Sequence, residues 1–310
     1  MIGGVGFRNL HHLIFYSRKM NKKKLRENLI GYQFVFLALA FFCLFILYPL
    51  VRVIVSSFHE INTLTQEFFF IGLENFINLF HDYVFWRALS NTVIYTVAII
   101  ILINIPAIVF AIILDRGKIK GNYFLRVVFF TPAILAPVLI GVTFKRIFAP
   151  MGALNMILVK TGLVFFKRNW LGVPSLALSA VIFTTVWQSA GWNMVLYYAR
   201  LKEIPKELYE AAAIDGASEW GIIRYIKLPL MREIIAVLVV INIIGGFKVF
   251  DLIYIMTRGG PAHKTEVLTS FLFYQAFDFF KWGYSSAVAV ILYVLVMFFT
   301  WLRISTAFKE

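Results

Sequence analysis

The chain has 310 residues, of which 61% are hydrophobic and 33 are phenylalanine, so its composition excludes an ordinary soluble domain and predicts an integral membrane protein. Its formal net charge is +14, but the basic residues lie between apolar runs rather than in one domain, which argues against a nucleic-acid partner and for contact with membrane lipid. The single cysteine, Cys43, excludes an intrachain disulfide.

Six apolar runs are long enough to cross a bilayer, which takes about 20 residues, so the sequence predicts an all-α membrane protein with six transmembrane helices. The predicted helices are Phe34 to Val55, Thr92 to Leu114, Val127 to Phe148, Leu176 to Tyr198, Ile234 to Met256 and Ser285 to Leu302. We expect a basic N-terminal segment over residues 1–33, without a signal peptide, and one membrane domain over 34–310.

The distribution of Lys and Arg predicts the orientation of the chain in the membrane. A dense basic cluster from Arg18 to Arg26 precedes the first predicted helix, and cationic residues are concentrated in the connections on the same side. This pattern places both termini in the cytoplasm. One connection argues weakly against this orientation, because it would leave several cations outside: Lys145, Arg146, Lys160, Lys167 and Arg168.

A polar segment, EAAAIDGASEWGIIRYIKLP, extends from Glu210 to Pro229 between two apolar runs. Pro205 suits the start of a helix, and Gly216 can take the left-handed dihedral that ends one. Ser218 can cap a second helix that carries Trp220. The segment is therefore predicted to form two short helices that meet at a bend. An amphipathic helix lying on the bilayer surface is the alternative, but such a helix needs neither the glycine bend nor the final Leu-Pro.

This segment resembles the EAA loop of the membrane subunits of ABC importers: Glu-Ala-Ala, three residues, Gly, nine residues, then Ile, any residue, Leu-Pro. Further stretches resemble the sugar-type permeases of that family, which import maltose-like oligosaccharides, other carbohydrates and glycerol phosphate. These stretches are Phe129-Phe130-Thr131-Pro132 through Pro137, Gly152-Ala153-Leu154-Asn155, Trp187, Gly191-Trp192, Phe247-Lys248-Val249-Phe250-Asp251 and Thr257-Arg258-Gly259-Gly260-Pro261.

The resemblance implies a type I ABC importer permease fold in the cell membrane, with six transmembrane helices and cytoplasmic termini. It also implies a second homologous permease subunit that completes a heterodimer, two ATP-binding subunits and an extracytoplasmic solute-binding protein. The large extracytoplasmic insertion of some maltose permease subunits is absent from this sequence. We therefore do not expect any contact with a binding protein that depends on that insertion.

The sequence contains no phosphate-binding loop, because its only Gly-Lys pair, Gly117-Lys118, is followed by Ile119. We expect no cofactor on this chain and no catalytic role, with ATP and Mg used by a partner ATPase. In the family the EAA loop, here residues 203–232, contacts that ATPase. The expected ATPase-coupling residues are Glu207, Glu210, Ala211, Ala212, Asp215, Gly216, Ile226, Leu228 and Pro229. The five histidines do not form a pattern that predicts a metal site.

Polar residues inside predicted spans are costly and are therefore candidates for a site. Three amides, Gln188, Asn193 and Asn242, are candidates for a substrate path because amides both donate to and accept from sugar hydroxyls. Hydrogen bonding between helices explains them equally well. Lys248 and Asp251 are expected to lie three apart on one helix and to pair, with a structural or gating role near its outer end.

Asn104, close to Pro106, is predicted to satisfy carbonyl groups freed by a kink. Four aromatic residues could stack on sugar rings, but an aromatic belt at the membrane surface is the favoured interpretation: Trp187, Trp192, Tyr197 and Tyr198.

Two other classes of protein share the composition. A self-contained ion-coupled carrier or channel would usually show internal repeats and ion ligands near broken helices, which the sequence lacks. An intramembrane enzyme would need paired catalytic groups, but Asp251 is the only clear intramembrane acid and has no aspartate partner. Neither class needs an EAA bend.

Overall fold

The computed structural model describes residues 32, 35–61, 65, 67–116 and 121–307. The predicted cytoplasmic segment 1–33 therefore lies outside the described residues, apart from Tyr32. The chain forms two units, residues 1–55 and 56–310. In the first unit, residues 35–42, the π-helical turn η1 (Cys43–Leu47) and α2 (Tyr48–Ser56) form one apolar helix. Its 22 residues are enough to cross a membrane, as predicted for this run.

The second unit consists almost entirely of helices, joined to one short antiparallel ribbon in which Glu60 pairs with Phe69. Its first elements are β1 (His59–Ile61), β2 (Phe68–Phe70), α3 (Glu74–His81), α4 (Tyr83–Asp115), α5 (Asn122–Ile134), α6 (Pro137–Ile147), α7 (Ala153–Lys160) and η2 (Val164–Phe166). They are followed by α8 (Ala177–Glu203), α9 (Lys206–Ile214), α10 (Glu219–Ile222), η3 (Ile223–Lys227), α11 (Leu228–Leu230), α12 (Arg232–Phe247), α13 (Asp251–Met256), α14 (Leu268–Phe273), η4 (Tyr274–Asp278) and α15 (Trp282–Ala307).

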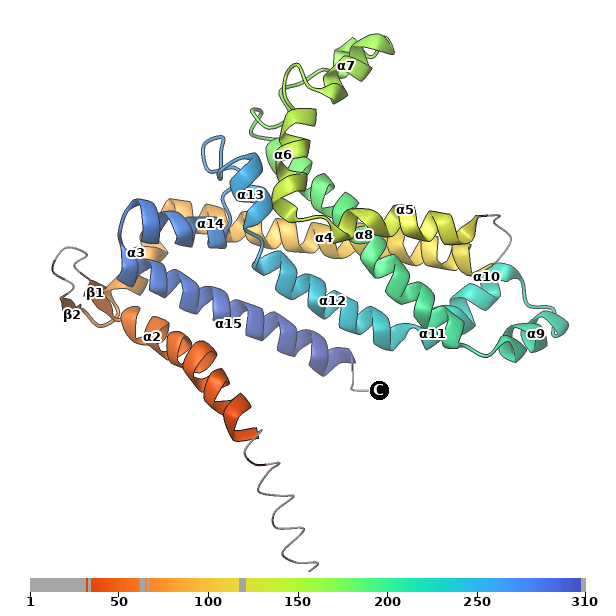
Figure 1. Cartoon of the computed structure of the whole chain (residues 1–310), viewed down its shortest axis with the longest axis horizontal. Helices are drawn as coiled ribbons and strands as arrows, with labels where there is room; N and C mark the ends of the chain where they lie inside the picture. The colour runs from red at the N-terminus through yellow and green to blue at the C-terminus, as the bar shows by residue number, and fades with distance from the viewer. Residues whose placement is uncertain (1–31, 33–34, 62–64, 66, 117–120, 308–310) are drawn as a thin grey trace, which may run out of the picture. The chain divides into compact units, whose positions relative to one another are not determined.

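The 33-residue helix α4 is the central element of this unit, and it packs on α8, α12 and α14 (Figure 1). Its buried residues recur at helical spacing, as in the series Tyr95, Ile99, Ile103, Ala107 and Ala111. Small residues toward one end let α8 approach closely. The result is a core in which α4 and α8 run side by side.

The third predicted span is not a straight helix. It consists of α5 and α6, which meet at an angle of 97°. Leu135 and Ala136 have extended backbone, as expected before a proline, and Pro137 begins α6 at a position where its missing N–H costs nothing. The run from Val127 to Phe148, predicted as one helix, is therefore two helices joined at a bend, and the pair remains a candidate span.

The fifth predicted span also contains a break. Helix α12 ends at Phe247, residues 248–250 are not helical, and α13 begins at Asp251. The expectation that Lys248 and Asp251 lie on one helix was wrong, and no salt bridge joins them among the described residues. Thr269 instead donates a hydrogen bond to the carbonyl of Val249 in this break.

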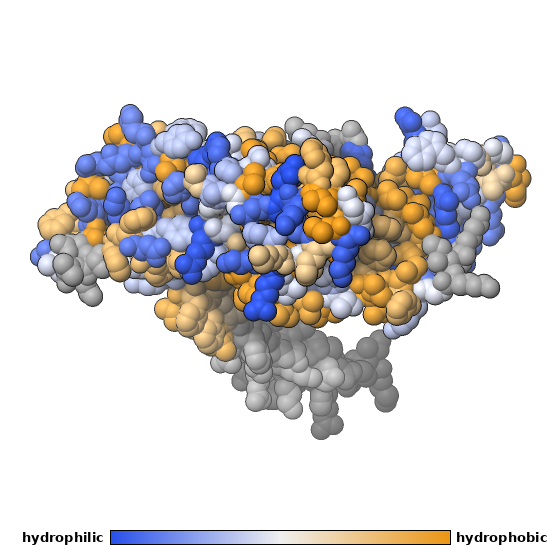
Figure 2. Space-filling model, turned by 90° about the horizontal axis from the view of Figure 1, so that it is seen from above, coloured by the Kyte–Doolittle hydropathy of each residue, from blue (hydrophilic) through white to orange (hydrophobic). Residues whose placement is uncertain are grey.

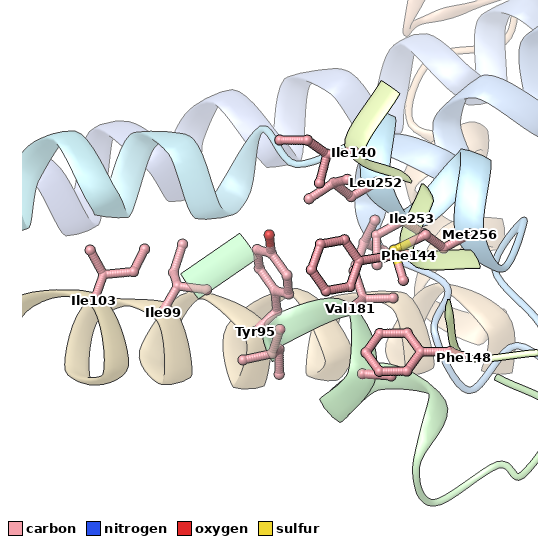
Figure 3. Packing of buried hydrophobic residues seen from close by; sticks show 13 residues of the cluster. Tyr95, Ile99, Ile103, Ile140, Phe144, Phe148, Val181, Leu252, Ile253 and Met256 are labelled. Atoms are coloured by element: carbon pink, nitrogen blue, oxygen red, sulfur yellow. The ribbon is translucent and has the colours of Figure 1, made fainter. Parts of the chain in front are cut away.

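Three hydrophobic clusters hold the second unit together. Figure 3 shows one of them, in which the ring of Phe144 from α6 lies beside Val181, Ile253 and Met256. Helix α6, which follows the bend after α5, therefore packs against α8 and α13. On the molecular surface, hydrophobic residues gather to the right of centre in Figure 2, and hydrophilic residues gather at the far right, where Figure 1 places α9 and α10.

Three helices among the described residues are long and apolar enough to cross a membrane, and up to five spans result if each bent pair counts as one. The three single helices are that of residues 35–56, α4 and α15. The predicted count of six transmembrane helices remains a prediction.

Candidate functional site

The EAA loop folds as two short helical arms joined by a tight bend. Its first arm is α9, which ends where Gly216 has φ +82°. The N–H of Ala217 donates to the carbonyl of Ala212 at 2.9 Å, and that of Gly216 donates to Ala213 at 3.1 Å. These two bonds form a Schellman motif, which ends a helix with a left-handed glycine. Ser218 Oγ then accepts from Gly221 N at 3.1 Å and caps α10. The second arm begins there and consists of α10, η3 and α11. The predicted bend and cap are confirmed.

The outer face of this loop is apolar as well as polar. Three large side chains around the bend are strongly exposed: Ile214 by 86%, Tyr225 by 74% and Trp220 by 65%. Glu207, Glu210 and Asp215 are exposed beside them, together with Ala211 and Gly216, whereas Ala212, Ile226 and Leu228 are half-buried. Pro229 is exposed and lies in α11, at the base of the second arm.

The inner face of the loop rests on a hydrophobic cluster at the end of α4 and α8. Tyr209 from the first arm and Ile223 from the second pack against this cluster, which contains Leu114, Leu201 and Met231. Burial, and secondarily the charge of Asp115, raises the pKa of Tyr209 to about 12. Both arms therefore pack against the same hydrophobic cluster.

A buried ionic group lies beneath the two arms, and it was not among the predicted site residues. Asp115, the last residue of α4, has a side chain that is only 7% exposed. Its Oδ2 accepts from Lys227 Nζ at 2.6 Å, and its Oδ1 lies 2.8 Å from Lys202 Nζ. Lys227 Nζ also lies 4.8 Å from the centre of the Tyr209 ring. No sequence signal indicated this contact, because Lys227 occupies the position of the EAA pattern at which any residue is accepted.

A second candidate site is a cavity of about 590 Å³ between α4, α8, α12 and the bend of α5 and α6. All three predicted amides, Gln188, Asn193 and Asn242, line it, and so do Lys248 and Asp251. Further polar lining comes from Tyr95, Thr185 and Ser189, and aromatic lining from Trp192 and Phe250. The cavity thus combines hydroxyl, amide and charged groups with aromatic faces.

The three amides differ in their present hydrogen bonds. Asn193 Nδ2 donates to Asn104 Oδ1 at 3.1 Å and so joins α8 to α4. Gln188 Nε2 donates to the Leu135 carbonyl at 3.2 Å. Asn242 Nδ2 is buried and has no partner among the described residues, although it borders the cavity. Of the three side-chain nitrogens, that of Asn242 is therefore the one without a hydrogen-bond partner among the described residues.

Two interpretations of polar and aromatic side chains were wrong. Asn104 does not bind a carbonyl freed by Pro106, which would be that of residue 102. It donates to Ile100 at 2.7 Å and accepts from Asn193 and Tyr197. Tyr197 is fully buried there, so it belongs neither to a surface belt nor to a sugar-stacking surface.

The other three aromatic residues are more exposed. Trp187 contacts Phe144, Trp192 stacks on Phe130 with ring centres 5.8 Å apart, and Tyr198 lies under Arg126 and Lys202.

Residues 91–304 match the family described as the inner membrane component of binding-protein-dependent transport systems. The chain belongs to this family. The permease therefore resides in the cell membrane as a multi-pass protein, and its EAA loop and the cavity of about 590 Å³ both lie within the matched region.

Similar proteins support the same assignment. The permease is 37% identical to the probable ABC transporter permease protein YurN of Bacillus subtilis over 274 residues, which are 88% of this chain and 94% of YurN. It is 30% identical to the lactose transport system permease protein LacF of Rhizobium radiobacter, over 89% of this chain and 93% of LacF. Its fold resembles that of a chain from a bacterial ABC transporter involved in alginate import, with TM-score 0.81, 20% identity and coverage of 94% and 100%.

Proposed function

We propose that this chain is the transmembrane permease subunit of an ATP-driven, binding-protein-dependent importer of carbohydrate. The observation that carries this proposal is the structure of the EAA loop. The loop bends at Gly216, exposes large apolar side chains on one face, and packs with its other face against the ends of α4 and α8. Family membership and the lactose permease relative support both the transport role and the carbohydrate class.

The exposed face of the EAA loop is proposed to dock on a partner ATPase. Exposed apolar side chains such as Ile214, Trp220 and Tyr225 favour burial against another protein. The proposed coupling residues are Glu207, Glu210, Ala211, Ala212, Asp215, Gly216, Ile226, Leu228 and Pro229. ATP and Mg act at the partner, and the loop passes ATPase closure to the membrane helices as a mechanical movement.

The proposed assembly contains this permease over residues 34–310, a second homologous permease, two ATP-binding subunits and an extracytoplasmic solute-binding protein. Membership of a family described as binding-protein-dependent supports the presence of a solute-binding protein in this assembly. Six transmembrane helices with both termini in the cytoplasm would place the basic segment 1–33 and the EAA loop on the side of the ATPase. The concentration of cations near Arg18 supports this orientation.

The cavity lined by Gln188, Asn193 and Asn242 is the proposed substrate path. Lys248 and Asp251, at the break between α12 and α13, are proposed as gating or structural residues. The unpartnered amide of Asn242 supports contact with a sugar hydroxyl, since a buried donor without an acceptor is costly. Asn242→Leu is expected to lower uptake at least about tenfold while leaving the ATPase bound, because a bidentate amide is lost from the path. Uptake equal to wild type would exclude Asn242 from the path.

The coupling role is tested with Gly216→Trp. This substitution puts a non-glycine residue at φ +82° on the bend. Gly162→Trp is the matched control, since Gly162 has φ +78° and, like Gly216, no neighbouring atom within 4 Å among the described residues, but lies outside the EAA loop. The chain is co-expressed with the proposed second permease, ATP-binding subunits and solute-binding protein. The complex is purified and reconstituted in liposomes with radiolabelled lactose, maltose or glycerol phosphate.

We expect ATP-dependent uptake by the wild type and by Gly162→Trp, and loss of uptake or of ATPase co-purification with Gly216→Trp. Wild-type transport by Gly216→Trp would refute the coupling role. Uptake by this chain alone without ATP would refute the importer and favour a self-contained carrier.

A further inference from the structure

Asp115 is an unusual residue for its position. It is the last residue of α4, where the helix dipole places partial negative charge, and its carboxylate is almost fully buried. Both conditions penalise a negative charge, so the fold must compensate it. Two lysines supply that compensation, one from α8 and one from the EAA loop.

The contact with Lys227 joins distant parts of the chain. Lys227 ends the π-helical turn η3 in the second arm, 112 residues from Asp115, and is itself only 8% exposed. Its ammonium group lies over the ring of Tyr209 from the first arm. The carboxylate of Asp115 is therefore connected to both arms through one cation. Lys202 adds the end of α8 to the same group.

Burial distinguishes this group from the other ion pairs nearby. Arg116 and Glu219 also connect the end of α4 to the second arm, at 3.2 Å, but their side chains are 40% and 61% exposed. An exposed pair can break and be replaced by water at little cost, whereas breaking a buried pair leaves an uncompensated charge. If the loop moves, α4 must follow it or the buried group is lost.

We infer that Asp115 is a positioning residue for transport, which passes displacement of the EAA loop to α4 through the contact of its carboxylate with Lys227. Helix α4 carries Tyr95, Ile99 and Ile103 into the wall of the proposed substrate path, so movement at its Asp115 end reaches that cavity. This inference rests on the proposed function, because it specifies how the loop is connected to the cavity.

The test is the amount of sugar taken up per ATP hydrolysed. The importer, isolated with its co-purifying permease, ATPase and binding protein, is reconstituted in liposomes with whichever of radiolabelled lactose, maltose or glycerol phosphate the wild type imports. Asp115→Asn keeps the shape of the side chain but removes its charge, and Asp115→Glu restores a carboxylate. Lys227→Met removes the cation, and Arg116→Gln is the control for the exposed pair.

We expect Asp115→Asn and Lys227→Met each to lower uptake per ATP about tenfold or more, because each removes the buried charged contact that joins η3 to the end of α4. The double variant is expected to be no worse than either single variant, since both remove one interaction. Asp115→Glu is expected to recover part of the ratio, and Arg116→Gln to stay within about twofold of wild type.

A purely structural role would lower the yield of assembled importer and leave uptake per ATP unchanged in the importer that does assemble, which would overturn the inference. If Asp115→Asn fails to assemble, Lys227→Met decides, since Asp115 then keeps Lys202 as its counterion. An unchanged ratio in Lys227→Met would overturn the inference while leaving the proposed function intact. Failure of the wild type to couple uptake to ATP hydrolysis would instead refute the proposed function, and the inference with it.

Discussion

Two adjacent glycines in α12 offer a direct test of how closely this helix packs on α4. A β-carbon at Gly246 would lie 2.6 Å from Oγ1 and 2.9 Å from Cβ of Thr96, whereas one at Gly245 would meet no atom of the described residues within 4 Å. Gly246→Ala therefore forces α12 and α4 apart or turns Thr96 away. Gly245→Ala makes the same chemical change in the same helix without that collision.

The size of the effect follows from terms that the two variants share and one that they do not. Each gains up to about 1 kcal/mol from replacing glycine by alanine within a helix. Only Gly246→Ala pays for overpacking, which costs about 1–3 kcal/mol. Turning Thr96 away would also break its hydrogen bond to the Thr92 carbonyl at 2.7 Å, worth about 1 kcal/mol. We expect Gly246→Ala to be less stable than Gly245→Ala by about 1–3 kcal/mol.

The measurement is reversible denaturant unfolding of the purified chain in detergent micelles, followed by tryptophan fluorescence. Adding Thr96→Ala to Gly246→Ala should recover part of the difference, because it removes Oγ1 and Cγ2 and leaves only the Cβ contact. Equal stability of the two single variants would refute the close contact between α12 and α4.

Three further predictions concern other parts of the fold. Gly191→Ala should destabilise the chain by about 2 kcal/mol or more, since its β-carbon would lie 1.8 Å from the Phe129 carbonyl oxygen, and chemical denaturation measures this change. Asn155→Leu should make the segment of residues 149–170 sensitive to limited proteolysis, because the buried amide bonds several of its backbone groups, including Arg168 O at 2.7 Å. Burial raises the pKa of Glu266, so the folded state favours its protonated form. Its contribution to stability is present at pH below the ordinary value of 4.5 and is lost as the pH rises through the raised pKa, and Glu266→Gln should remove this dependence in melts taken across that range.

Local signals in the sequence were sufficient for the EAA bend. Gly216 and Ser218 act on their own backbone and on residues within five positions, so their roles as helix end and cap do not depend on the rest of the fold. The apolar runs likewise indicated the cores of α4 and α15, because length and hydropathy alone determine which segments suit a bilayer.

The breaks within apolar runs were harder to predict. Hydropathy does not change at Pro137 or at Lys248 strongly enough to divide a span, although Pro137 was a visible signal for the bend between α5 and α6. The contact between Asp115 and Lys227 could not be predicted, because no pattern in one sequence indicates which of several lysines meets a carboxylate more than a hundred residues away.

The substrate-path residues fall between these cases. A polar side chain in an apolar run is a clear signal, and Gln188, Asn193 and Asn242 do line one cavity. Whether such an amide is occupied by a neighbouring helix depends on packing. Asn193 binds Asn104, whereas the nitrogen of Asn242 has no partner in the described part of the chain, a difference that only the arrangement of α4, α8 and α12 determines.

The hydrogen bonds between α4 and α8 have a consequence for how force travels through the permease. Most core threonines of these helices, such as Thr92 and Thr184, donate to carbonyls of their own helix. Polar contacts between the two helices occur at three levels: Tyr95 with Thr185, Asn104 with Asn193 and Tyr197, and Asp115 with Lys202. Nine residues of helix, or about 13 Å, separate Tyr95 from Asn104. Attachment at several separated points opposes both sliding and pivoting of one helix against the other, which favours movement of α4, about 50 Å long, together with α8. In the proposed coupling, a push at the Asp115 end of this pair would therefore reach the cavity as a tilt of both helices together.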